Sequence, residues 1–130
     1  MSEHAHIRTP LARVRGRGAA RSGTHDFWVQ RVTSVASVPL TIMAIIIVIS
    51  LLGRNQAAAA QILGSPLVAI IMVLFVICNV VHMRIGMRVI IEDYVHDDNG
   101  KLGLLIANTC FCWVIGLISV YALLKLSFGL

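Results

Sequence analysis

Charged residues are scarce in this chain of 130 residues: only 13% are Asp, Glu, Lys or Arg, whereas 58% are hydrophobic. The mean hydropathy is +0.85. A soluble domain of this size could not bury so much apolar surface, so the composition excludes an ordinary soluble fold and requires a lipid bilayer as solvent. The sequence also lacks an internal repeat, a glycine-rich phosphate loop and an acid–base dyad.

Cysteine and its motifs are also limited. The three cysteines, Cys78, Cys110 and Cys112, all lie within apolar runs, where we expect them to be small buried hydrophobic residues rather than a disulfide framework. No Cys-x-x-Cys-His motif occurs. This absence excludes covalent attachment of a c-type haem.

Long hydrophobic runs are what the sequence does contain. Three stretches without Asp, Glu, Lys or Arg lie at 32–53, 55–82 and 102–124. Each reaches the roughly 20 residues of a transmembrane helix, and all are too continuous for the strands of a membrane barrel. The sequence therefore predicts an all-α membrane protein with three transmembrane helices, at about 29–53, 64–95 and 101–125. Asn108, the one amide in the third run, is expected to hydrogen-bond across helices.

The net charge of +5 could indicate nucleic-acid binding, but the distribution of charge argues against it. All six carboxylates and most cations lie before the first span or around the loop between the second and third. Only Arg54 and Lys125 lie on the other side. By the positive-inside rule the N-terminus is cytoplasmic and the C-terminus outside. We expect a basic cytoplasmic arm at 1–24 and a three-helix domain at 25–130; an organellar transit peptide is an alternative interpretation of the arm, which is rich in Arg and poor in acids.

The segment 82–94 carries most of the ionisable residues near the membrane. At about 100° per residue, an offset of 11 brings His82 and Asp93 onto one face of a helix, about 16 Å apart along its axis. Gly86 lies near the same stripe. The helix thus offers an imidazole in the apolar zone, a patch without a side chain, and a carboxylate with Tyr94 at its end. This pattern indicates a cofactor site followed by a polar site at the membrane edge.

Each of these residues also has a plainer interpretation. An imidazole at bilayer depth is a functional candidate and a usual axial ligand of haem iron, but His82 could equally hydrogen-bond another helix. Gly86 fits either a flat macrocycle or close helix packing. Asp93 and Tyr94 fit either a ligand site or a solvated helix end, and Arg31 either a cation for an anionic cofactor group or a topological anchor.

Other cations are expected elsewhere. Arg84 and Arg88 should point away from His82, toward lipid headgroups or a docked partner.

Together these residues resemble a known family. The sequence His-Met-Arg-Ile-Gly-Met-Arg-Val-Ile-Ile-Glu-Asp-Tyr-Val at 82–95 is similar to the signature of the D-type membrane anchor of bacterial succinate dehydrogenase, respiratory complex II. His-Asp-Phe-Trp-Val-Gln-Arg-Val-Thr at 25–33 resembles the family's entry into its first helix. Arg-Thr-Pro-Leu-x-x-Val-Arg-Gly at 8–16 is similar to the arm of bacterial members.

The resemblance implies roles for particular residues. His82 would be one axial ligand of haem b, with the other ligand from a companion C-type anchor subunit, and Gly86 would pack against the haem face. His25 and Arg31 would lie near the haem propionates. Tyr94 would hydrogen-bond ubiquinone, with Asp93 beside it.

The resemblance also implies the role of the whole chain. It would be a non-catalytic, multi-pass anchor in the bacterial inner (plasma) membrane, holding the flavoprotein and iron–sulfur subunits and supplying part of the site of ubiquinone reduction. The alternatives are the anchor of a quinol:fumarate reductase, or a small structural or assembly membrane protein without haem.

Overall fold

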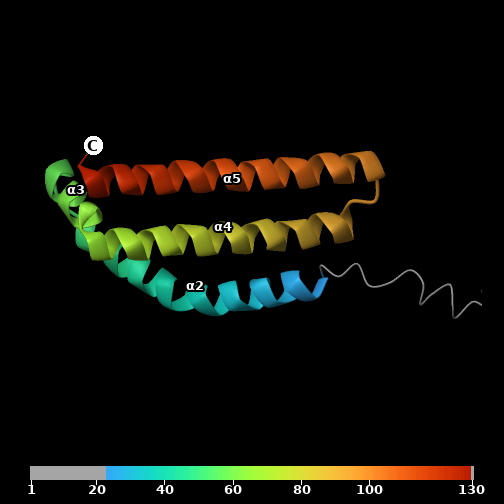
Figure 1. Ribbon diagram of the computed structural model, residues 1–130, viewed down its shortest axis with the longest axis horizontal. Helices are drawn as coiled ribbons and strands as arrows, with labels where there is room; N and C mark the ends of the chain where they lie inside the picture. Colours follow the sequence, from blue (N-terminus) through green and yellow to red (C-terminus); the bar gives the residue numbers. More distant parts are fainter. Residues whose placement is uncertain (1–22, 130) are drawn as a thin grey trace, which may run out of the picture.

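The computed structural model of the chain describes residues 23–129. This part contains four helices, α2 (Gly23–Leu51), α3 (Gln56–Gly64), α4 (Pro66–Tyr94) and α5 (Asp98–Phe128), and no strand. The three long helices lie side by side with alternating direction, and short α3 crosses one end of the group (Figure 1). The predicted arm at 1–24 falls almost entirely outside the described residues.

The three long helices are suited to cross a bilayer. Thr24–Leu51, Pro66–Tyr94 and Asp98–Phe128 are all long and apolar enough, and only 6% to 11% of their most apolar windows is buried within the chain. A helix of 29 residues, such as α4, is about 42 Å long at 1.5 Å per residue, against a hydrocarbon core of about 30 Å. The prediction of an all-helical fold with three membrane-spanning helices is confirmed.

The ends of these helices are set by local capping. Pro66 occupies the first turn of α4, where its missing N–H costs nothing. The α4–α5 connection is shorter than the sequence suggested, because the Asp97 carboxylate accepts a hydrogen bond of 2.6 Å from the Gly100 N–H. That cap starts α5 at Asp98, ahead of the expected 101.

Helix α2 changes direction along its length (Figure 1), and Pro39 lies inside it. Proline has no N–H to donate to the carbonyl four residues earlier, which explains a bend at this position. At the far end of the group, α3 packs closely against α5. A Cβ on Gly64 would stand 2.7 Å from the Leu126 carbonyl oxygen, so this contact requires glycine.

Helix α4 is central, with α2 and α5 packed on either side of it. The buried side chains of the described chain form a small core, made of Ala44, Ile47, Ala69, Ile85, Ile91 and Cys112. The outer faces of α2 and α5 are apolar and exposed, as expected of surfaces that meet lipid or other subunits. Cys110 lies on such a face, so the expectation that all three cysteines are buried is wrong: Cys112 is buried and Cys78 half-buried.

Candidate functional site

A polar stripe on α2 faces α4 within an otherwise apolar helix pair. It consists of Asp26, Gln30, Thr33 and Ser37, spaced four, three and four residues apart, which places them on one face of the helix. All four side chains form contacts with α4. Polar contacts between helices at bilayer depth fix how the two helices pack.

His82 on α4 meets the middle of this stripe. Its Nδ1 lies 3.1 Å from the Thr33 hydroxyl and 3.5 Å from the Ser34 hydroxyl. Thr33 donates its own hydrogen to the Val29 carbonyl at 2.8 Å, and Ser34 donates to the Gln30 carbonyl at 2.7 Å. Because both hydroxyls have already used their hydrogens, they accept from His82, and Nδ1 carries the proton. The lone pair of the imidazole is therefore on Nε2.

The Gln30 amide lies against that lone pair. Its nitrogen is 3.3 Å from His82 Nε2 and donates to it. The other end of the amide, Gln30 Oε1, is buried and has no hydrogen-bond partner in the described part of the chain. A buried carbonyl without a partner is costly and calls for an explanation.

Gly86 lies against Gln30. A Cβ at this position would stand 3.4 Å from the Gln30 amide nitrogen, an ordinary van der Waals contact. The predicted pair of His82 and Gly86 is thus brought together, one turn apart, around a single side chain of α2.

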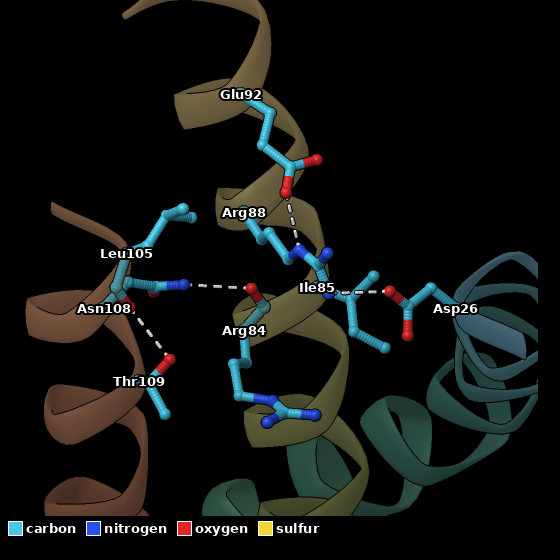
Figure 2. A pocket seen from close by; sticks show the side chains of 8 residues that line it. All are labelled: Asp26, Arg84, Ile85, Arg88, Glu92, Leu105, Asn108 and Thr109. Atoms are coloured by element: carbon cyan, nitrogen blue, oxygen red, sulfur yellow. Dashed lines mark hydrogen bonds and ion pairs between the residues drawn. The ribbon is translucent and has the colours of Figure 1, made fainter. Parts of the chain in front are cut away.

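An ion-pair network ties the same two helices near the start of α2. Arg88 donates to Asp26 of α2 at 2.9 Å and to Glu92, one turn further along α4, at 2.7 Å. Figure 2 shows Arg88 between the two carboxylates. From the sequence, Arg88 was expected to meet lipid headgroups or a docked partner. Instead, its long side chain reaches across to α2.

On the other side of α4, Asn108 of α5 donates to the Arg84 carbonyl at 3.0 Å, which confirms the predicted hydrogen bond across helices. A polar cavity of about 260 Å³ lies here, lined by residues of α4 and α5 and by Asp26 of α2 (Figure 2). It is lined by the side chains shown there: Asp26, Arg84, Ile85, Arg88, Glu92, Leu105, Asn108 and Thr109.

The remaining predicted site residues lie at exposed positions. His25 is exposed in the first turn of α2, and Arg31 is exposed with its guanidinium carbon 4.9 Å from the centre of the Phe27 ring. Asp93 and Tyr94 are exposed at the end of α4, with Tyr94 78% accessible.

Comparison with known proteins gives a consistent result. Residues 6–116 match the family described as succinate dehydrogenase/fumarate reductase transmembrane subunit. The chain belongs to this family. It is 33% identical over 121 residues to the succinate dehydrogenase hydrophobic membrane anchor subunit of Paracoccus denitrificans, covering 93% of both chains. The subunit of the same name from Rickettsia bellii is 28% identical, over 81% of this chain and 84% of its own. No solved structure matches the chain.

The resemblance proposed from the 82–95 segment is thereby confirmed at the level of the family. The chain is a membrane anchor subunit of the succinate dehydrogenase family and a multi-pass protein of the bacterial inner membrane. The relatives bear the name of an anchor subunit, which places this chain among the subunits of a larger complex.

Sequence reasoning missed the α2 half of this anchor's polar cluster. Gln30, Thr33 and Ser34 were not predicted, because uncharged polar side chains are weaker signals of a site than ionisable ones. The signal was present: the polar positions at 26, 30, 33 and 37 follow helical periodicity through the start of the first apolar run.

Proposed function

We propose that this anchor subunit, with its N-terminus cytoplasmic, holds the flavoprotein and iron–sulfur subunits of a succinate:quinone oxidoreductase at the membrane. In this proposal His82 is one axial ligand of haem b, a companion anchor subunit supplies the second, and Tyr94 forms part of the ubiquinone-reduction site. The observation that carries the proposal is the 3.1 Å contact of His82 Nδ1 with the Thr33 hydroxyl, which leaves Nε2 as the nitrogen for a ligand. The chain itself contributes no machinery for oxidising succinate.

The donor set fits a haem. An axial histidine must be neutral at the nitrogen that meets iron, and its other nitrogen is usually fixed by a hydrogen bond. Thr33 supplies that hydrogen bond to Nδ1 of His82. Gln30 would leave Nε2 as the ligand enters, and its buried Oε1 would gain the chance of a partner. When bound, haem b would accept and release single electrons near the quinone site.

Charge at one end of the helices supports the proposed orientation. The start of α2 and the α4–α5 connection lie at the same end (Figure 1). Arg31, Arg84, Arg88 and Lys101 lie toward this end, whereas Arg54 and Lys125 lie toward the opposite end. An excess of cations marks the cytoplasmic side of membrane proteins. Soluble subunits on the cytoplasmic side would therefore dock beside Tyr94.

Tyr94 suits a quinone. Its hydroxyl is exposed at the end of α4, at a level that a lipid-soluble ligand reaches from the bilayer edge. There it would donate a hydrogen bond to a quinone carbonyl, which polarises the ring as electrons arrive. Asp93 beside it would orient a neighbouring group or relay protons. His25 and Arg31, both exposed on α2, would meet the haem propionates.

A different function has one observation in its favour. Both ring nitrogens of His82 already have hydrogen-bond partners within the chain, as in a histidine that merely joins two helices. Such a chain would be a structural or assembly protein without haem. The unpartnered Gln30 oxygen argues against a finished packing contact.

Purification of the tagged full chain in mild detergent separates the two functions. The proposal predicts that a flavoprotein, an iron–sulfur subunit and a second membrane subunit co-purify, and that the reduced-minus-oxidised spectrum contains a b-type haem band. The structural alternative predicts a preparation without that band.

A further inference from the structure

Arg84 lines two adjoining cavities between α4 and α5, and neither belongs to the site around His82. One is the polar cavity of about 260 Å³ described above (Figure 2). The other is an apolar groove of about 530 Å³ walled by Val76, Val80, Trp113 and Val120, among others. A polar cavity that meets an apolar groove at one cation has the shape of a site for an amphiphile.

The charge of Arg84 is not balanced by its neighbours. The two ion pairs found among residues 23–129 both belong to Arg88, which engages the Asp26 and Glu92 carboxylates of the polar cavity. Figure 2 shows the Arg84 side chain pointing away from that network. A half-buried guanidinium inside a membrane-spanning helix is costly unless an anion accompanies it.

The depth of Arg84 indicates which anion. It lies 18 residues beyond Pro66, the start of α4, and therefore about 27 Å along the helix. The hydrocarbon core is about 30 Å thick, so this position is close to the core boundary on the side where α2 begins. The lipid headgroup region begins just beyond this level, within reach of a phosphate that dips toward Arg84.

The length of the groove matches that of one lipid acyl chain. Val76 lies eight residues from Arg84, or about 12 Å deeper along α4. On α5, Val120 lies twelve residues from Asn108, which contacts the Arg84 carbonyl, or about 18 Å deeper. Half of the hydrocarbon core is about 15 Å. The groove thus spans one leaflet, as a single acyl chain does.

We propose that the groove between α4 and α5 binds a phospholipid with an anionic headgroup. Its phosphate pairs with Arg84, the headgroup extends into the polar cavity near Asn108 and Thr109, and one acyl chain lies along the groove. The two helices are in contact at the groove floor, where a Cβ on Gly116 would stand 3.4 Å from the Val80 side chain. A quinone fits the apolar groove but leaves the charge of Arg84 unmatched.

Trp113 provides a direct probe, because it lines the groove and is 59% exposed. The chain has two tryptophans, so Trp28→Phe leaves Trp113 as the only indole. The full-length Trp28→Phe chain in neutral detergent is titrated with phosphatidylglycerol or phosphatidylcholine carrying brominated acyl chains. The proposal predicts half-maximal quenching at about 5- to 10-fold lower phosphatidylglycerol than phosphatidylcholine, from one charge-assisted contact.

In this background, Arg84→Gln should remove the preference for phosphatidylglycerol, and Arg54→Gln, at the other end of the helices, should retain it. Ile77→Phe, at an exposed groove position, should weaken quenching by phosphatidylglycerol without removing a charge. This variant serves as the test if circular dichroism shows that Arg84→Gln does not fold. Equal quenching by both lipids, or a preference that survives Arg84→Gln, would overturn the proposal in favour of unspecific lipid contact or a different cation.

Discussion

Replacement of Thr33 by valine tests the geometry around His82 most sharply. The two side chains have nearly the same shape, so Thr33→Val removes the hydroxyl and leaves the packing of α2 on α4. The hydroxyl accepts from His82 Nδ1 at 3.1 Å and donates to the Val29 carbonyl at 2.8 Å. Without it, the Nδ1 proton has only the more distant Ser34 hydroxyl, at 3.5 Å.

The expected effect follows from that lost hydrogen bond. A buried donor left without a good partner costs about 1–3 kcal/mol, and partial replacement by Ser34 favours the lower half of this range. About 1–2 kcal/mol corresponds to a ~5- to 30-fold weaker hold on haem. An imidazole with a weaker Nδ1 hydrogen bond is also a poorer electron donor to iron, so the midpoint potential should shift upward.

The assay is haem content per flavin, with a redox titration of the purified complex. Thr33→Ser should keep both near wild type because it restores the hydroxyl. Thr109→Val is the matched control: Thr109 makes the same kind of bond to the carbonyl four residues earlier, at 2.9 Å, and lies on α5 away from His82. Wild-type haem content and potential in Thr33→Val would refute the reasoning, as would equal losses in Thr109→Val.

Three further predictions concern the rest of the proposed site. Gly86→Ala should be tolerated, because an added Cβ would stand 3.4 Å from the Gln30 amide nitrogen. Gly86→Leu should lower haem content, because its longer side chain fills that space. Equal haem content in both variants would contradict this prediction. Arg31→Leu should lower the haem midpoint potential, since it removes the cation that is proposed to face the propionates; an unchanged redox titration would leave Arg31 only the role of a topological anchor. Tyr94→Phe should reduce succinate–quinone turnover roughly 5- to 150-fold by removing one hydrogen bond, while electron transfer to an artificial acceptor at the soluble subunits stays near wild type; parallel loss in both assays would assign Tyr94 to assembly.

The fold was predictable because it depends on hydropathy and length. Three uncharged runs leave the backbone no alternative to helices in lipid. Helix ends were less predictable: α5 begins before the expected position since the Asp97 cap depends on one side-chain geometry. Likewise, nothing in the local sequence indicated that Arg88 would reach Asp26, 62 residues earlier, because that pairing depends on how α2 and α4 pack.

Half of the candidate site was predictable. His82 and Gly86 stood out because an imidazole and a missing side chain are unusual in an apolar run of that length. Gln30 and Thr33 were missed, although their spacing follows helical periodicity, because an amide and a hydroxyl are inexpensive at the start of a membrane helix. Which of them meets His82 is decided by the relative rotation of the two helices, and single-helix patterns contain no such information.

Whether His82 binds haem b can be read from the reduced-minus-oxidised spectrum of the complex carrying His82→Ala. His96→Ala is the matched control, since His96 lies just beyond α4 and is exposed. Flavin content and subunit composition would verify assembly in both variants. If His82 is an axial ligand, the b-type band is lost or shifted in His82→Ala and unchanged in His96→Ala. An unchanged band with full haem content in His82→Ala would contradict it.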